Sequence, residues 1–178
     1  GHSHLTALAQ TLLLCSLQGV KCFSEIADRL TAFKAERHIA AGAWVISFGY
    51  DQTAMREGRH PDAAFLDRIL PENPVLLTHA SGHMGVLNTA AMQALGIGKD
   101  TPAPGGGVIG RNPDGTPNGY LEEAAFTSLT ARVPRPDAGQ AEQSLLAAER
   151  IYLKNGITTI QDGLTRAPEW ALLHAVRK

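Results

Sequence analysis

Residues 156–163 read Gly156-Ile157-Thr158-Thr159-Ile160-Gln161-Asp162-Gly163, the most strand-like segment of the chain. Several of its residues are β-branched, and such side chains are favoured in pleated, half-buried strands. A long helical pattern precedes the segment over residues 137–155, and Gly156 stands just beyond the helix end, as expected of a glycine that terminates a helix. A helix followed by an apolar strand is typical of α/β proteins.

The rest of the chain continues this alternation of helices and strands. Helices are expected at residues 5–17, 24–39, 61–70, 84–95, 121–133 and 168–178, and strands at 44–50 and 74–79. The strand at 74–79 is apolar without alternation, which predicts burial on both faces. A small hairpin is expected around the Asp114-Gly115 turn, with arms at 108–111 and 119–121. The predicted fold class is therefore α/β.

Composition excludes several classes of protein. The 178 residues are 44% hydrophobic and 19% charged, which argues against disorder. The net charge is −1 with the basic residues scattered, so no nucleic-acid partner is expected. The sequence has no apolar run long enough for a membrane span, so no membrane partner is expected. Cys15 and Cys22 are expected to be free thiols in a reducing compartment, and without a signal-peptide pattern the expected location is cytoplasmic.

Two histidines at the start of the chain, His2 and His4, are candidate metal ligands. In an extended backbone, residues two apart point to the same face, so both imidazoles can reach one zinc or similar divalent ion. Two donors do not complete a site, because a catalytic zinc usually takes three protein ligands and a water. The alternative is that this His-x-His pair is a tag remnant or a disordered tail.

Four separated motifs are Gly1-His2-Ser3-His4-Leu5; Pro74-Val75-Leu76-Leu77 with Gly82-His83 and Asn88-Thr89-Ala90-Ala91; Gly106-Gly107-Val108-Ile109 with Asp114-Gly115-Thr116-Pro117-Asn118-Gly119-Tyr120-Leu121-Glu122; and residues 156–163. Together they resemble the metal-dependent amidohydrolase superfamily, in its amidohydrolase-3 branch with the N-substituted formamide deformylases. The motifs occur in the family's order over nearly the whole chain.

The resemblance implies a partial TIM barrel of the metallo-dependent hydrolase type that carries a long α+β insertion. Residues 1–22 would be the start of the barrel after its first strand, and 23–134 the insertion. Residues 135–178 would form a helix, the second barrel strand and the helix that follows it. Family members are about three times this long, so the chain is expected to be an internal fragment.

The implied activity is that of a metal-dependent hydrolase acting on amide or other non-peptide C–N bonds through a metal-activated water. The expected cofactor is one or two divalent ions, zinc first, and the expected partner is a small amide-like substrate. The family's other ligands are typically a carboxylated lysine or other bridging residue, two more histidines and a late aspartate. They do not occur here, so no complete catalytic set is expected and the isolated chain is predicted to be inactive.

Other polar residues are weaker candidates. Asp162 is a candidate supporting carboxylate beside the metal ligands, with a turn or cap residue as the alternative. His83 is a candidate substrate contact, with a histidine bonded to loop backbone as the alternative. His79 is expected to be a satisfied buried histidine, His60 a surface residue without partners, and Asn88 a helix cap or loop brace. Glu122 and Glu123 are expected at the start of a helix, and Glu123 has no expected site role.

Different functions remain open at this point. The chain is alternatively an autonomous, non-enzymatic α/β module that binds a ligand or partner. A nucleotide site rests only on Gly105-Gly106-Gly107, which lacks the lysine and serine or threonine of a P-loop. Self-association into a homo-oligomer is expected through open sheet edges beside residues 157–162.

Overall fold

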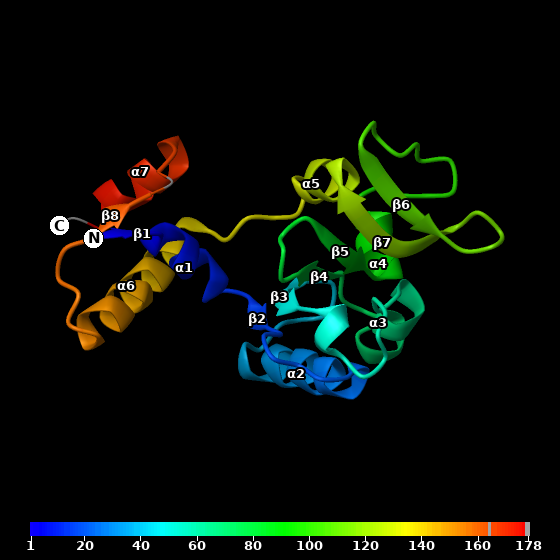
Figure 1. The fold of residues 1–178 in the computed structure, drawn as a ribbon, viewed down its shortest axis with the longest axis horizontal. Coiled ribbons are helices and arrows are strands. Elements are labelled where there is room, and N and C mark those ends of the chain that lie inside the picture. Colours follow the sequence, from blue (N-terminus) through cyan, green and yellow to red (C-terminus); the bar gives the residue numbers. More distant parts are fainter. Residues whose placement is uncertain (164, 177–178) are drawn as a thin grey trace. The chain divides into compact units, whose positions relative to one another are not determined.

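The structure, a computed structural model, describes residues 1–163 and 165–176 and divides into two compact units (Figure 1). Unit 1 comprises Gly1–Leu14 and Arg135–Lys178, and unit 2 comprises Cys15–Pro134. Unit 2 thus begins somewhat before residue 23, where the sequence placed the start of the insertion, and ends at the same residue. The α/β class is confirmed. Among the described residues, no helix combines the length and the apolar composition that crossing a bilayer requires.

Unit 2 is built on one six-stranded mixed sheet. Its strands are β2 (Cys15–Ser16), β3 (Val45–Tyr50), β4 (Val75–His79), β5 (Met84–Leu87), β6 (Gly107–Arg111) and β7 (Pro117–Glu123). Their order is β2-β3-β4-β5-β7-β6, in which β2, β3 and β4 run parallel and the other pairings are antiparallel. The carboxyl ends of β3, β4 and β7 therefore meet at one edge of the sheet, where β5 begins.

Helices cover both faces of this sheet. They are α2 (Phe23–Glu36), α3 (Ala63–Ile69), α4 (Thr89–Ala94) and α5 (Ala124–Thr130), with a 3-10 turn η1 (Gln52–Ala54) after β3. Val75 and Leu77 of β4 join a core with the side chains of α2 and α3, while Leu76 joins a second core with α4 and α5. The predicted burial of this strand on both faces is confirmed.

Unit 1 is a short parallel strand pair covered by helices. Its elements are β1 (His2–Ser3), α1 (Leu5–Thr11), α6 (Ala138–Lys154), β8 (Gln161–Asp162) and α7 (Ala167–Ala175). Leu5 and Ala9 of α1 pack against Leu145 and Ala148 of α6 to form a small core. The predicted helix at 137–155 is confirmed, because Asp137 caps α6 through a capping box.

Two expected helices begin or end as strands instead. The helix expected at 5–17 ends at Thr11, and Cys15–Ser16 pairs with β3. The helix expected at 84–95 begins as β5, and α4 starts only after Asn88. The parts that differ lie in short, largely apolar runs, and such runs do not distinguish a buried helix from a buried strand.

Two further boundaries differ from the expectation. The helix expected at 121–133 starts at Ala124, because Leu121 to Glu123 continue β7 opposite β5 and β6. Of the strand expected at 157–163, the described residues that pair with β1 are Gln161 and Asp162. The Asp114-Gly115 hairpin is confirmed as β6 and β7. The helix expected at 168–178 is α7, and residues 177–178 lie outside the described part of the chain.

Candidate functional site

The opening residues of the chain are paired into structure. His2 aligns with Gln161 and Ser3 with Asp162 in the parallel β1–β8 pair, and the backbone N–H of Gly163 donates to the carbonyl of Ser3 at 2.7 Å. The alternative of a disordered tail therefore does not describe them. Side chains alternate along a strand, so His2 and His4 share one face and Ser3 faces the other.

Gly163 leaves the space that both imidazoles occupy. A Cβ at this position would overlap Cε1 of His2 and lie 2.5 Å from its Nε2 and 2.9 Å from Cε1 of His4. The two imidazole rings are 5.2 Å apart between centroids and nearly perpendicular, at 87°. Both side chains are exposed. Two reachable imidazoles that converge over a residue without a side chain fit the first two donors of a divalent metal site.

The rest of the ligand set does not come from the described residues. Within residues 1–163 and 165–176, no group of three or more histidine, cysteine or acidic side chains is placed to hold a metal ion. A catalytic zinc normally has three protein donors, so His2 and His4 supply two of them at most.

Asp162 lies on the opposite face of the strand pair from the two imidazoles. It aligns with Ser3, and its Oδ2 accepts hydrogen bonds from the hydroxyls of Thr6 in α1 at 2.6 Å and Thr165 at 3.2 Å. Ser3 hydrogen-bonds Tyr152 of α6 on the same side. The carboxylate thus joins the end of β8 to the helix layer and has the contacts of a turn residue. Its Oδ1 is buried and has no hydrogen-bond partner within the part of the chain that the structure describes.

His83 lies in unit 2, in the turn before β5. Its Nδ1 is 3.1 Å from Oε2 of Glu123, and its carbonyl accepts from the N–H of Glu123 at 2.7 Å. Both side chains are largely exposed, at 63% and 53%. The structure brings His83 together with Glu123, which the sequence analysis left without a role, because β5 and β7 are adjacent.

A second polar cluster lies at the same edge of the sheet in unit 2. The hydroxyl of Tyr50 is 3.0 Å from Nδ1 of His60, and both rings contact the ring of His79. His60 also stacks on Tyr120 at 4.6 Å. The prediction of His60 as a surface residue without partners is wrong: it is half-buried in this cluster. His60 lies in a loop, where no sequence periodicity indicates which residues it contacts. Its partners come from strands β3, β4 and β7, and only the order of the strands brings them together.

Burial controls the protonation of this cluster. Desolvation raises the pKa of Tyr50 far above its usual range, and desolvation lowers the pKa of His60, with the charge of His79 adding to the decrease. Desolvation and a hydrogen bond to Glu122 raise the pKa of Tyr120 to about 12. His79 accepts from the N–H of Ser81 at Nδ1; its buried Nε2 has no hydrogen-bond partner among the described residues and lies 3.8 Å from Oδ1 of Asp51. His79 was expected to have its hydrogen-bonding groups paired, and within the described residues this is true of Nδ1 and not of Nε2.

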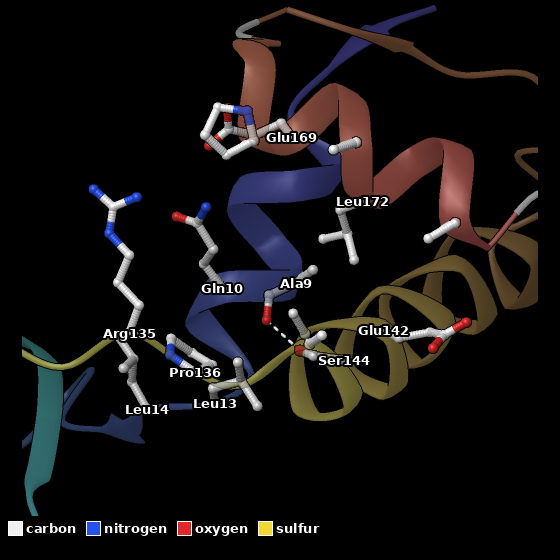
Figure 2. Close-up of a pocket in the computed structure, with 15 residues that line it drawn as sticks. Ala9, Gln10, Leu13, Leu14, Arg135, Pro136, Glu142, Ser144, Glu169 and Leu172 are labelled. Carbon is white, nitrogen blue, oxygen red and sulfur yellow. Dashed lines mark hydrogen bonds between the residues drawn. The ribbon is translucent and has the colours of Figure 1, made fainter.

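A cavity of about 720 Å³ lies in unit 1 between α1, α6 and α7 (Figure 2). Small and apolar side chains line most of it, including Ala9, Leu13 and Leu172. The hydroxyl of Ser144 donates to the carbonyl of Ala9 at its wall. None of the predicted site residues lines this cavity, so it is separate from the imidazole pair.

Comparison with known proteins agrees with the resemblance seen in the sequence. The pattern of the Amidohydrolase family matches residues 1–178. The N-substituted formamide deformylase of Arthrobacter pascens is 34% identical over 175 residues, covering 93% of this chain and 31% of the relative. The putative amidohydrolase YtcJ of Bacillus subtilis is 30% identical over 157 residues, covering 88% of this chain and 29% of the relative.

Solved structures show the same fold. An uncharacterised metal-dependent hydrolase from Pyrococcus furiosus superposes with a TM-score of 0.66 at 21% identity, over 99% of this chain and 33% of that chain. A second, from Pyrococcus horikoshii, gives 0.67 at 18% identity, over 99% of this chain and 32% of that chain. This protein has the fold of part of these hydrolases. The chain belongs to the amidohydrolase family and spans about a third of the length of the relatives it matches.

Proposed function

We propose that the chain is part of a metal-dependent hydrolase in which His2 and His4 are metal ligands. The observation that carries the proposal is the convergence of both imidazoles over Gly163 on one face of the β1–β8 pair. Membership of the amidohydrolase family supports it. We propose that the whole protein hydrolyses amide or other non-peptide C–N bonds of small molecules, since one relative is a formamide deformylase.

Residues on both faces of the β1–β8 pair have a role in the proposed site. His2 and His4 would hold a divalent ion, with zinc as the proposed metal because imidazole nitrogens suit it. When bound, the metal would polarise the substrate carbonyl and lower the pKa of a water. Ser3 and Asp162, bonded to Tyr152 and Thr6, fix the strand pair from the helix side and so hold the imidazoles in register.

We propose that unit 1 is a segment of a TIM barrel and that unit 2 is an insertion into it. The parallel pairing of β1 with β8, each followed by a helix, supports this arrangement. In such barrels the active site lies at the carboxyl ends of the strands, which is where His4 and Gly163 stand. Because the described residues supply two donors at most, we propose that the isolated chain is inactive.

The two cysteines support the proposal that the protein works in a reducing compartment such as the cytoplasm. Both are free thiols. Burial raises the pKa of Cys15 to about 11, so its thiol stays protonated and unreactive.

The proposed function predicts that hydrolysis by the whole protein needs both the metal and the imidazole pair. Chelation is expected to abolish amide hydrolysis, and added Zn²⁺ to restore it. His2→Ala is expected to lower kcat/KM by more than about a hundredfold, because a metal ligand is lost. The matched control is His174→Ala, an exposed histidine on α7 away from the pair. The proposal would be contradicted if a chelator left the rate of hydrolysis unchanged, or if His2→Ala and His174→Ala lowered kcat/KM equally.

A separate prediction concerns association of the 178-residue chain. The β1–β8 pair has no further strand beside it within the described residues, and unit 1 exposes Leu153, Ile157 and Trp170 at 42–59%. We propose that these edges and apolar side chains drive homo-oligomer formation. Light scattering is expected to show a mass that rises with concentration. A constant monomer mass across the range would contradict this.

A further inference from the structure

We propose that Glu123 is a positioning residue that fixes the tautomer of His83, and that the free Nε2 of His83 recognises the N–H group of an amide ligand. The role of Glu123 depends only on the geometry of the sheet edge in unit 2. The choice of an amide as the ligand of His83 rests on the proposed function.

The contact between the two side chains determines where the imidazole proton lies. Nδ1 of His83 is 3.1 Å from Oε2 of Glu123. A carboxylate only accepts hydrogen bonds, so Nδ1 must be the protonated nitrogen of the neutral ring. Nε2 then carries a lone pair and can accept a hydrogen bond but not donate one.

The backbone holds the pair together as well. The N–H of Glu123 donates to the carbonyl of His83 at 2.7 Å, so the two residues are joined by main chain and side chain. Glu123 has φ 50° and ψ −122°, a conformation that non-glycine residues rarely adopt. Such strain persists where the surrounding structure imposes it, and it gathers at functional sites. Here it occurs in the residue that orients the imidazole.

Exposure singles out His83 among the histidines of this edge. Its side chain is 63% exposed, whereas Nε2 of His79 is buried and His60 is half-buried against Tyr50. A ligand can therefore reach His83 without displacing a neighbour.

The chemistry of the surroundings selects the ligand. The carboxylates of Glu122 and Glu123 disfavour an anion at this edge. A lone pair at Nε2 favours a hydrogen-bond donor, and an amide has an N–H where the corresponding ester has none. An ester cannot supply that hydrogen bond, so the amide is expected to bind His83 more tightly than the ester.

The tautomer is tested first, by ¹⁵N–¹H correlation of the histidine rings in the 178-residue chain. We expect the Nδ1–H form to predominate in the wild type and its ratio to the Nε2–H form to fall several-fold in Glu123→Ala. Glu122→Ala is the matched control, because that carboxylate accepts from Tyr120 instead. If Glu123→Ala fails to fold, Glu123→Gly removes the same carboxylate and suits a positive φ. An unchanged ratio, or an equal change in the control, would overturn the assignment.

Ligand recognition is tested by titrating the same chain with N-methylacetamide, methyl acetate and acetate while following the His83 ring signals. We expect saturable shifts with the amide, at least about fivefold weaker binding of the ester and the anion, and loss of this preference in Glu123→Ala. Equal binding of amide and ester, or no saturation with the amide, would overturn the ligand assignment. Neither measurement needs metal or turnover, so failure here is distinguishable from failure of the proposed hydrolase function.

Discussion

Zn²⁺ binding by the chain is expected to weaken about tenfold to a hundredfold when Gly163 is replaced with alanine. The new methyl group would occupy the space in which the imidazoles of His2 and His4 converge, so at least one ring has to turn away. The atoms that it meets are the far ends of side chains. We therefore expect the free energy of unfolding to change little while the metal affinity falls. Calorimetric titration with Zn²⁺ measures the affinity.

Three variants give this titration its reference points. Gly139→Ala is the matched control in the same unit, because a methyl group there meets nothing closer than 3.4 Å. The double variant His2→Ala/His4→Ala gives the Zn²⁺ affinity of the chain without the two imidazoles. If either Gly163→Ala or the double variant binds Zn²⁺ as tightly as the wild type, the ion binds elsewhere.

Unit 2 is expected to lose about 3–4 kcal/mol of stability in Asn88→Ala. Oδ1 of Asn88 accepts from the N–H groups of Val75 and Ala91, each at 2.9 Å, and Nδ2 donates to the carbonyls of Leu70 and Asn73. The residue is fully buried, so four backbone groups would each lose one hydrogen bond away from water. At about 1 kcal/mol for each hydrogen bond, the sum reaches this range. Urea unfolding, followed by Trp44 fluorescence in a Trp170→Phe background, measures it.

The matched control for this prediction is Asn112→Ala. Asn112 is exposed and its side chain makes one hydrogen bond, to the hydroxyl of Thr116. Its loss is expected to cost less than about 1 kcal/mol. A cost below about 1 kcal/mol for Asn88→Ala would mean that the network can rearrange or that water replaces the side chain.

Elements whose signals are local were predictable from the sequence. The helix α6 has its capping box at Asp137 and Gln140 and its glycine beyond the end, all within one segment. The β6–β7 hairpin follows from the Asp114-Gly115 turn, and β4 from an apolar run of the length of one strand. Asn88 was expected as a cap or brace, and its bond to the N–H of Ala91 confirms this.

Features that depend on pairing between distant segments were not predictable. Met84–Leu87 becomes a strand only because β4 and β7 lie on either side of it. The spacing of His2 and His4 predicted a shared face, but the register of β8 decides that Gly163 lies between their rings. In the same way, Glu123 meets His83 through strand order and not through any sequence pattern.

The place of unit 2 in the chain, between α1 and α6, bears on how the protein folds. Pairing of His2 with Gln161 must close a loop that contains all of unit 2. Leu14 and Arg135 border the same cavity of unit 1, and folding of unit 2 leaves less flexible chain between these two residues. Loop-closure entropy rises with the length of flexible chain, and long-range contacts form late for that reason. We therefore expect the face of the β1–β8 pair that carries His2 and His4 to assemble last.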